Sequence, residues 1–264
     1  MSDGMHVDYD AIASTYDRRY VADTMAAVGS ALADLAQRIG TCRVLEVGCG
    51  TGHWLIQLAD QVPSVVGIDR SAGMLHQARA RASSLAFAQG IAEQLPCRAE
   101  SVDLVFCVNA LHHFDRPRAF LGEAYRLLRP GGLIAIVSTD PHGRRAGWYL
   151  YDYFVGTYAS DLCRFPSWPT LLRWLKGAQF VRRDCRLVVE IDEHRTGRQV
   201  LEDPFLEKGA CSQLALLSDT AYAAGLARIH AALDAVQDLE TAPVFDTDLR
   251  LALITAWKPG RESD

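Results

Sequence analysis

The sequence lacks the features that mark several large classes of protein. Its longest apolar run, near residues 102–110, is too short to cross a bilayer, and the chain does not open with the basic and then apolar pattern of a signal peptide. Its seven cysteines form no Cys-x-x-Cys pair and are odd in number, which argues against a zinc site and a disulfide framework. We therefore expect a cytoplasmic protein with no metal and no membrane partner.

The sequence also contains fewer basic than acidic residues. The 27 basic and 32 acidic residues leave a net charge of -5, which offers no basic surface to the phosphate backbone of a nucleic acid. The 264 residues, of which 49% are hydrophobic and 22% charged, fit one ordinary globular domain with a substantial core. The expected partner is a small molecule and not a nucleic acid, and the expected state is a monomer or a homodimer.

A glycine turn after a short apolar strand is the most informative feature that is present. Residues 43–47 read Arg-Val-Leu-Glu-Val, and Gly48, Gly50 and Gly52 follow at alternate positions. Glycines permit a positive φ and a close approach of the backbone to a ligand, and the amides after them point outward at the start of a helix. The spacing is not the GxGxxG of dinucleotide sites, because His53 stands where the third glycine is needed, and the lysine of a phosphate-binding P-loop is missing. The turn predicts a ligand that is adenosine-like, with phosphate not the obvious choice.

The turn and the segments around it resemble a known enzyme family. Residues 46–52, Glu-Val-Gly-Cys-Gly-Thr-Gly, are similar to the first motif of class I S-adenosylmethionine-dependent methyltransferases. The opening Tyr9–Asp17 resembles the Tyr-Asp-x-Ile-Ala-x-x-Tyr-Asp start of the small-molecule branch, which includes methyltransferase type 11 and proteins like the ubiquinone and menaquinone methyltransferases. Further segments resemble this branch in the same order, so that the likeness covers residues 9–140: Val65–Asp69 with Arg70–Leu75, Gln89–Pro96, Ser101–Phe114 and Leu127–Val137.

The resemblance implies that the cofactor is S-adenosylmethionine and gives roles to single residues. Asp69 ends the second strand, where an acid can accept both hydroxyls of a ribose, and Met74 is placed to cover an adenine face. Asn109 and Ala110 are expected beside the methionine part of the cofactor. The cofactor-binding residues expected in this way are Tyr16, Glu46, Gly48, Cys49, Gly50, Gly52, Asp69, Arg70, Met74, Ile91, Ala92, Glu93, Asn109 and Ala110.

One of these residues departs from the family's pattern. Ile91 stands where the family has an acid that hydrogen-bonds the adenine amino group. The backbone amide of Ala92 and apolar packing by Ile91 would then have to hold the ring. The substitution therefore bears on the affinity for the cofactor or on its selectivity.

Short apolar strands alternate with helical patterns over residues 41–138, which is the sequence form of a parallel sheet covered by helices on both faces. We expect an α/β fold with a seven-stranded, Rossmann-like, doubly wound sheet, mostly parallel with an antiparallel terminal hairpin, plus helical lid insertions. The predicted strands are 43–47, 64–68, 85–89, 102–109, 133–138, 182–192 and 246–257. The expected parts of this single domain, 1–264, are cap helices in 1–40, the cofactor-binding core in 41–140, lid insertions in 141–165 and 193–243, and the rest of the sheet in 166–192 and 244–258.

The first lid insertion is rich in aromatic residues. Such a cluster is consistent with ordinary packing against the sheet, since aromatic side chains contribute heavily to any core. It is equally consistent with a wall around an organic acceptor, because insertions after the fifth strand can reach the carboxyl ends of the strands, where ligands bind in open α/β sheets. The residues concerned are Trp148, Tyr149, Tyr151, Tyr153, Phe154, Tyr158 and Phe165.

Transfer of a methyl group from a sulfonium is an in-line displacement, so most of the catalysis is positioning of a nucleophile about 3 Å from the methyl carbon. A base is needed only if the acceptor must lose a proton. His112 and His113 are the first candidates for that base, because they follow the central strand, where the methyl group is expected. The predicted acceptor atom is an O, N or C of an apolar or aromatic metabolite.

Three alternatives remain open at this point. A relative of the same fold can use the bound sulfonium without transferring its methyl group. A non-catalytic cofactor-binding module would keep the glycine turn and leave no cavity beside the methyl position. A nicotinamide-binding Rossmann domain would bind NAD tightly, although the glycine spacing argues against it.

Overall fold

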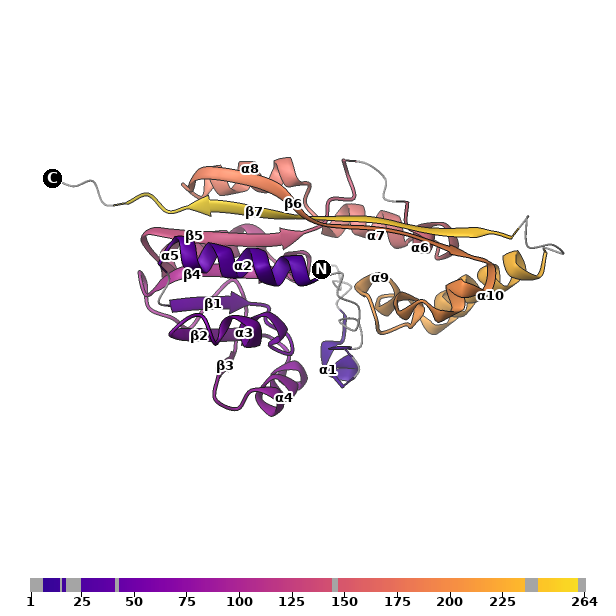
Figure 1. The fold of residues 1–264 in the computed structure, drawn as a ribbon, viewed down its shortest axis with the longest axis horizontal. Helices are drawn as coiled ribbons and strands as arrows, with labels where there is room; N and C mark the ends of the chain where they lie inside the picture. The colour runs from indigo at the N-terminus through magenta and orange to yellow at the C-terminus, as the bar shows by residue number, and fades with distance from the viewer. Residues whose placement is uncertain are drawn as a thin grey trace.

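The computed structural model describes residues 7–14, 16–17, 25–40, 43–143, 147–235 and 242–260. They form one sheet in the order β3-β2-β1-β4-β5-β7-β6 (Figure 1). Neighbouring strands from β3 to β5 are parallel, and β7 is antiparallel to both β5 and β6, which confirms the predicted sheet. The strands are β1 (Arg43–Val47), β2 (Ser64–Asp69), β3 (Ala86–Gln89), β4 (Val102–Val108), β5 (Leu128–Ser138), β6 (Val181–Thr196) and β7 (Val244–Trp257).

Four of the five parallel strands lie within one residue of their predicted bounds. The exception is β5, which was expected to begin at residue 133 and begins at Leu128. Val102 already pairs with Leu128, and the register shifts before Leu104 pairs with Leu133. The Pro-Gly-Gly turn is therefore an irregularity inside the strand pair, with Gly131 in the left-handed region at φ 81°.

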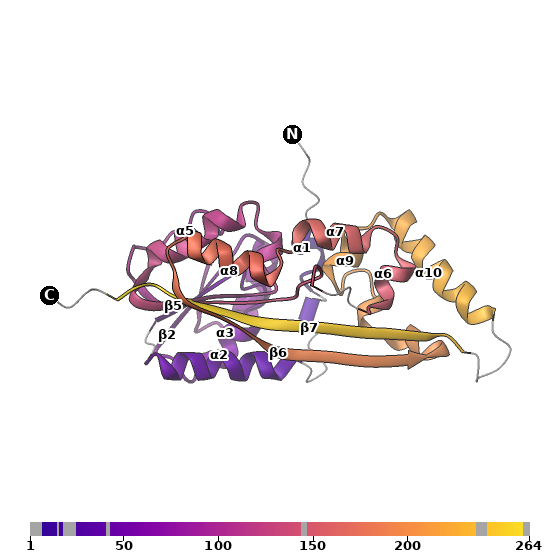
Figure 2. The ribbon, with the colours of Figure 1, turned by 90° about the horizontal axis from the view of Figure 1, so that it is seen from above.

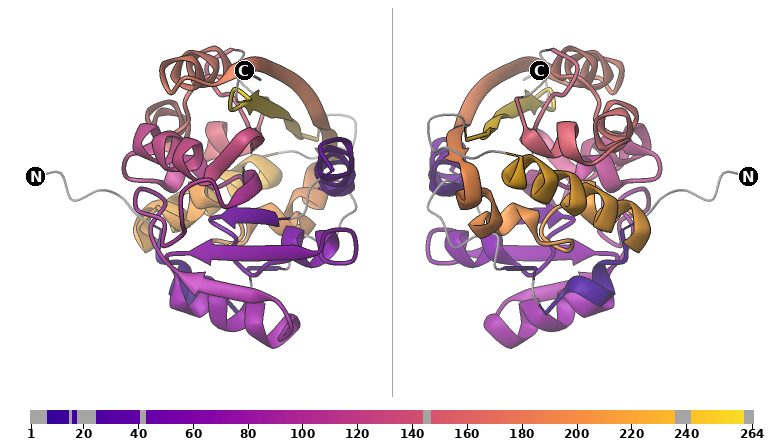
Figure 3. Two further views of the ribbon diagram at one scale, coloured as in Figure 1. Left: turned by 90° about the vertical axis from the view of Figure 1, so that its left-hand side faces the viewer. Right: turned by 90° about the vertical axis from the view of Figure 1, so that its right-hand side faces the viewer.

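Helices cover both faces of the sheet, as the alternating pattern predicts (Figure 3). Buried side chains of α2, α3 and α4 pack on one face around Phe106, and those of α5 and α8 pack on the other around Leu45 and Val105. Apolar residues fill both layers because parallel strands in such a sheet are buried on both sides. These helices are α2 (Ala26–Arg38), α3 (His53–Leu58), α4 (Ala72–Arg81), α5 (Pro117–Leu127) and α8 (Trp168–Gly177).

The terminal hairpin is longer than predicted. β6 and β7 pair from Val181 with Trp257 to Thr196 with Val244, whereas β5 pairs only with the last six residues of β7. The two strands therefore continue past the sheet as a two-stranded ribbon (Figures 1 and 2). The second insertion was expected to begin at residue 193, but β6 runs to Thr196, so the insertion is the loop at the end of this ribbon.

Both insertions gather at the end of the molecule that the ribbon reaches (Figure 1). They share a core of their own, in which Leu150 and Phe154 of the first insertion pack with Leu214 and Ile229 of the second. None of the described helices is long and apolar enough to span a membrane. The elements of the insertions are α6 (Tyr149–Tyr153), α7 (Thr157–Arg164), the short 3-10 turns η4 (Gly197–Glu202) and η5 (Pro204–Leu206), α9 (Ser212–Ala215) and α10 (Asp219–Asp234).

The predicted N-terminal cap is described in part. Its first helix is α1 (Tyr9–Ile12), which contacts α4, and α2 packs on the sheet as described above. Residues 1–6, 15 and 18–24 of the cap lie outside the described residues.

Candidate active site

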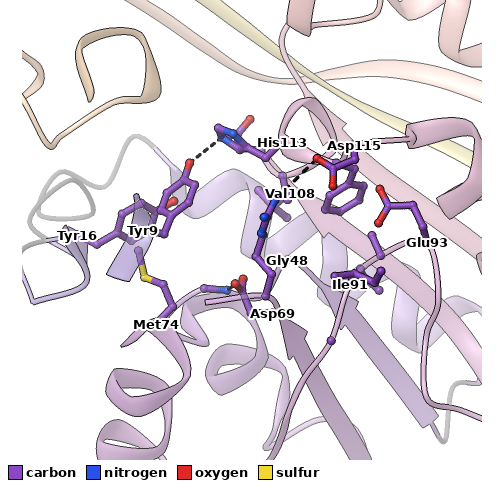
Figure 4. Close-up of a pocket in the computed structure, with 18 residues that line it drawn as sticks. Tyr9, Tyr16, Gly48, Asp69, Met74, Ile91, Glu93, Val108, His113 and Asp115 are labelled. Carbon is purple, nitrogen blue, oxygen red and sulfur yellow. Dashed lines mark hydrogen bonds and ion pairs between the residues drawn. The ribbon is translucent and has the colours of Figure 1, made fainter. Parts of the chain in front are cut away.

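A cavity opens at the carboxyl ends of β1, β2 and β4, next to the point where the strand order reverses. β1 pairs with β2 on one side and with β4 on the other, so the chain leaves this edge in two directions. Ligands of open α/β sheets bind at such switch points. We call this space the first cavity; it encloses about 680 Å³, including the part open to solvent (Figure 4).

The glycine turn forms the floor of the first cavity and requires glycine for two reasons. Gly48, Gly50 and Gly52 have φ values of 74°, 53° and 76°, a region in which other residues are strained. A Cβ on Gly48 would lie 2.6 Å from the Cβ of Ala110, and one on Gly52 would lie 3.0 Å from the ring of Phe87. The backbone can therefore approach a ligand only because these positions carry no side chain.

Asp69 holds the turn and lines the first cavity. One carboxylate oxygen accepts the Gly50 amide at 2.8 Å, and the other accepts the Ser71 amide at 2.9 Å. Burial raises the pKa of this carboxyl, while the hydrogen bonds from Ser71 and Gly50 oppose the rise. Each carboxylate oxygen can accept a further hydrogen bond, so the geometry is compatible with the predicted ribose contact.

Glu46 lies beneath the turn and not in the wall of the first cavity. Its side chain is 1% exposed, and among the described residues its Oε2 has no hydrogen-bond partner. Burial, and secondly the negative charge of Asp69, raise the pKa of Glu46 well above its usual range, although the Leu55 amide opposes this. Glu46 therefore lies in the buried layer of the structure and not against the first cavity.

The N-terminal segment closes one side of the first cavity with Tyr9 and Tyr16. Each tyrosine is followed by an aspartate that fastens the segment to the core. Asp10 accepts hydrogen bonds from the Ser71 hydroxyl at 2.6 Å and the Gly73 amide at 2.7 Å, which lower its pKa. Asp17 in turn accepts the Thr51 hydroxyl and the Arg81 guanidinium, each at 2.5 Å. The repeated Tyr-Asp pair is thus a repeated anchor for an aromatic wall.

The opposite side of the first cavity carries charged and apolar residues together. Arg70 comes from the end of β2, Ile91 and Glu93 from the loop after β3, and Phe114 and Asp115 from the segment after β4 (Figure 4). The guanidinium of Arg70 lies 3.9 Å from the Asp115 carboxylate, and both side chains are about half exposed.

A second cavity lies under the insertions and shares a wall with the first. It encloses about 890 Å³, including space open to solvent. Tyr9, Asn109 and His113 line both cavities. The remaining lining residues come from the start of α2, the segments after β4 and β5, the ribbon and both insertions: Met25, His112, Thr139, Trp148, Tyr151, Phe165, Ile191, Phe205, Cys211, Ser212, Gln213, Leu249 and Leu251.

The aromatic cluster of the first insertion divides between the two expected roles. Tyr149, Leu150 and Phe154 are buried in the core that the insertions share, as ordinary packing predicts. Trp148 and Tyr151 belong to the same core and also line the second cavity. The cluster therefore both builds the lid and walls a cavity.

Polar side chains at the far end of the second cavity are paired through one buried carboxylate. Asp161 is fully buried and accepts hydrogen bonds from the Tyr151 hydroxyl and from the Gln213 side-chain amide, both at 2.7 Å. Arg164 forms an ion pair with the same carboxylate at 2.5 Å. This network joins the two insertions, and it leaves the cavity wall mainly apolar.

The two adjacent histidines take different positions. His113 lines both cavities, and its Nε2 lies 2.6 Å from the hydroxyl of Tyr9 in a hydrogen bond. His112 lines only the second cavity of the two, where its ring stacks on Phe165 with the ring centroids 3.8 Å apart. Of the pair, His113 is the one that adjoins the first cavity.

Most of the residues expected to bind the cofactor surround the first cavity. Glu46, Cys49 and Gly52 do not line it. The lining residues that sequence reasoning did not include are Tyr9, Val47, Gly90, Val108, Phe114 and Asp115; all of them except Asp115 lie in segments that resemble the family. Those that do line it as expected are Tyr16, Gly48, Gly50, Asp69, Arg70, Met74, Ile91, Ala92, Glu93, Asn109 and Ala110.

Comparison with known proteins finds sequence similarity over the central part of the chain. Residues 45–136 match the family described as a methyltransferase domain. A malonyl-[acyl-carrier protein] O-methyltransferase of Hahella chejuensis is 37% identical over 128 residues, which are 47% of this chain and 45% of that protein. The chain thus spans about half the length of this curated relative.

Solved structures extend the likeness to most of the chain. A putative methyltransferase from Bacillus halodurans matches with a TM-score of 0.60 and 25% identity, over 87% of this chain and 99% of that one. The [4+2]-cyclase SpnF matches with a TM-score of 0.55 and 19% identity, over 87% of this chain and 80% of that one, so that likeness concerns the fold alone. Together the comparisons confirm the predicted fold, and they match residues 45–136 to a methyltransferase domain.

Proposed function

We propose that this chain, whose residues 45–136 belong to the methyltransferase domain family, transfers the methyl group of S-adenosylmethionine to a small and largely apolar acceptor. The observation that carries the proposal is the wall of Tyr9, Asn109 and His113 between the two cavities. A cofactor in the first cavity, with its methionine part beside Asn109, would have its methyl group at the entrance to the second cavity. In-line attack requires this arrangement of donor and acceptor.

The lining of the second cavity supports an acceptor with an apolar or aromatic body. Trp148, Phe165 and Phe205 offer ring surfaces, and Leu249 and Leu251 come from the ribbon. Pockets of this kind bind mainly by apolar contact and orient the ligand with a few polar groups. The polar groups nearest to the cofactor are those of the shared wall, so the reactive atom of the acceptor would lie there.

His113 is the residue that we expect to take a proton when the acceptor has one to lose. The acceptor atom bonds to the methyl carbon, the carbon–sulfur bond breaks, and its electron pair remains on sulfur to give S-adenosylhomocysteine. The proton then passes to His113, either directly or through the hydroxyl of Tyr9. His112, the other candidate base, is stacked on Phe165, and we assign it to the wall of the second cavity.

The competing reaction is one in which bound S-adenosylmethionine assists without losing its methyl group. The [4+2]-cyclase among the structures of this fold shows that the fold does not decide the reaction. A non-catalytic module is less well supported, because it predicts no cavity beside the methyl position, whereas the second cavity adjoins Asn109, which is expected beside the methionine part of the cofactor.

Incubation with methyl-labelled S-adenosylmethionine and a panel of phenols, carboxylic acids and amines with one- and two-ring bodies tests the proposal. We expect label in a product together with an equal amount of S-adenosylhomocysteine. The variant His113→Asn should lose most of the transfer and keep S-adenosylhomocysteine binding, while His76→Asn, on the exposed face of α4, should keep both. Consumption of an acceptor with no label in the product would overturn methyl transfer in favour of the cyclase-like alternative.

A further inference from the structure

Ile91 leaves the adenine end of the first cavity without the acid that the family has at this position. The side chain lines the cavity and is 48% exposed. An adenine ring would cover it, but an isoleucine cannot accept the hydrogen bonds that the amino group of adenine donates. A buried donor without a partner weakens binding, so another acceptor is expected at this end.

Three carboxylates line the first cavity, and two of them accept backbone amides. Asp69 receives the amides of Gly50 and Ser71, which places it at the turn. Glu93 receives the amide of Arg116 at 2.9 Å. Asp115 is the third carboxylate, and its side chain is 54% exposed.

A hydrogen bond from the Arg116 amide to the Glu93 carboxylate bears on the position of Asp115. It joins the loop after β3, which carries Ile91, to the segment after β4, which carries Asp115. Both residues therefore belong to the same end of the first cavity, as the close-up shows (Figure 4). Arg70 reaches this end from β2, and its ion pair with Asp115 is long, at 3.9 Å. A carboxylate has about four lone-pair sites, so Asp115 can accept a hydrogen bond from a ligand beside this contact.

We propose that the carboxylate of Asp115 accepts a hydrogen bond from the adenine amino group of S-adenosylmethionine and so replaces the acid that is missing at Ile91. The proposal rests on the proposed function for the identity of the cofactor. It makes Asp115 a determinant of specificity for adenine. A hypoxanthine ring carries a carbonyl where adenine carries its amino group, and a carbonyl oxygen facing a carboxylate is repelled.

Calorimetric binding of S-adenosylhomocysteine and of S-inosylhomocysteine to the full chain tests this assignment. The wild type should bind the adenine compound at least about tenfold more tightly, because only adenine can donate a hydrogen bond to the charged carboxylate from this position of the ring. In Asp115→Asn the preference should fall below about threefold, because the asparagine amide can both accept and donate. Ile91→Asp in the Asp115→Asn background should restore a preference of about tenfold, because it returns an acid to the family's position.

Further variants separate a direct contact from indirect effects. Arg70→Gln removes the ion pair and should leave the adenine preference intact, even if both ligands bind more weakly. Asp60→Asn makes the same change in charge at an exposed position after α3 and should alter neither dissociation constant.

Two results would overturn the assignment while leaving the cofactor in place. One is an unchanged adenine preference in Asp115→Asn, and the other is loss of that preference in Glu93→Gln instead. Failure of the wild type to bind S-adenosylhomocysteine at all would be a different result, since it would reject the cofactor itself and the assignment with it.

Discussion

The two cavities share three residues but are built from the chain in opposite ways. The first cavity is lined mainly by short segments that follow β1, β2, β3 and β4, so each contributes a local turn at one edge of a rigid sheet. The second cavity is lined by Trp148 and Phe165 from one insertion, Phe205 and Gln213 from another, and Leu249 from the ribbon. Its walls meet because the ribbon, the shared core and the Asp161 network hold the two insertions together.

If the proposed function holds, this difference would separate the binding of the cofactor from the choice of the acceptor. The sheet and its buried layers determine the first cavity, whereas a separate small core and the Asp161 network determine the second. A change in the insertions can therefore reshape the second cavity and leave the first unaltered. The following variants test this independence.

Gly48→Ala should have the largest effect on stability and on ligand binding, because it places a side chain on the turn that lines the first cavity. The new Cβ would lie 2.6 Å from that of Ala110 at a φ of 74°, so strain and overpacking together should cost about 2–5 kcal/mol of unfolding free energy. Binding of S-adenosylhomocysteine should be lost with the turn. Calorimetry and urea unfolding measure the two effects.

Gly131→Ala is the matched control for this variant. Gly131 has a φ of 81°, but a Cβ there would meet none of the described atoms within 4 Å. It should show the strain alone, about 1–2 kcal/mol, and bind S-adenosylhomocysteine normally. Equal behaviour of the two variants would contradict the role of close approach at Gly48.

Asp69→Ala should weaken binding of S-adenosylhomocysteine by about a hundredfold or more. The substitution removes charge-assisted hydrogen bonds to the ribose and releases the Gly50 amide that shapes the turn. The measurement is the dissociation constant by calorimetry, with Asp60→Ala as a surface control. A dissociation constant equal to that of the wild type would refute the ribose assignment.

Gly225→Ala should disturb the packing of the insertions and leave the packing of the sheet unchanged. A Cβ on this residue of α10 would lie 2.1 Å from the ring of Phe154, and overpacking of this kind costs about 1–3 kcal/mol. Hydrogen exchange should become faster in residues 197–235 and remain slow in β1 and β4, and methyl transfer should fall. Binding of S-adenosylhomocysteine should stay within about threefold of the wild type.

Gly122→Ala provides the comparison for Gly225→Ala within a helix. Gly122 lies inside α5, where a Cβ would meet none of the described atoms within 4 Å, so alanine should stabilise the helix by about 0.5–1 kcal/mol. Loss of cofactor binding in Gly225→Ala, with Gly122→Ala unaffected, would show that the two cavities are coupled.

Glu46→Gln should have the smallest effect on the unfolding free energy, and the size of this effect should depend on pH. The pKa of Glu46 is raised in the folded state, so its contribution to stability is fully present below the unfolded value of 4.5 and is lost as pH rises through the folded value. Glutamine carries no such dependence. The unfolding free energy of Glu46→Gln relative to the wild type should therefore be higher at pH 8 than at pH 5.

Urea unfolding at the two pH values measures this gap. Glu190→Gln, which neutralises a carboxylate that is 60% exposed, should show no comparable change with pH. A gap for Glu46→Gln that shrinks between pH 5 and pH 8 would contradict the raised pKa.

The parallel core was predictable because its signals are local. The apolar run at β1, the acid at the end of β2 and the glycines between 48 and 52 are each contiguous in the sequence, and the strands lie almost where the pattern places them. The start of β5 could not be predicted from the sequence, because it depends on the pairing of Leu128 with Val102 beside an irregular turn.

The positions of several side chains could not be predicted in this way. Tyr9 reaches His113 across 104 residues, and Gln213 reaches Asp161 across 52. Asp115 had no motif to mark it, since its place beside Ile91 depends on the contact between Glu93 and Arg116. Adjacent residues in the sequence, such as His112 and His113, also separate into different environments once the chain turns.

The sequence by itself indicated the bounds of most of the sheet's parallel strands and the position of the glycine turn, because backbone conformation at glycines and the apolar pattern of strands depend on neighbouring residues. The tertiary structure alone decided that a second cavity adjoins the first, that His113 lines both of them, and that Asp115 and Ile91 line the same cavity. These features depend on contacts between segments far apart in the chain, and such contacts form only when the sheet and the ribbon bring those segments together.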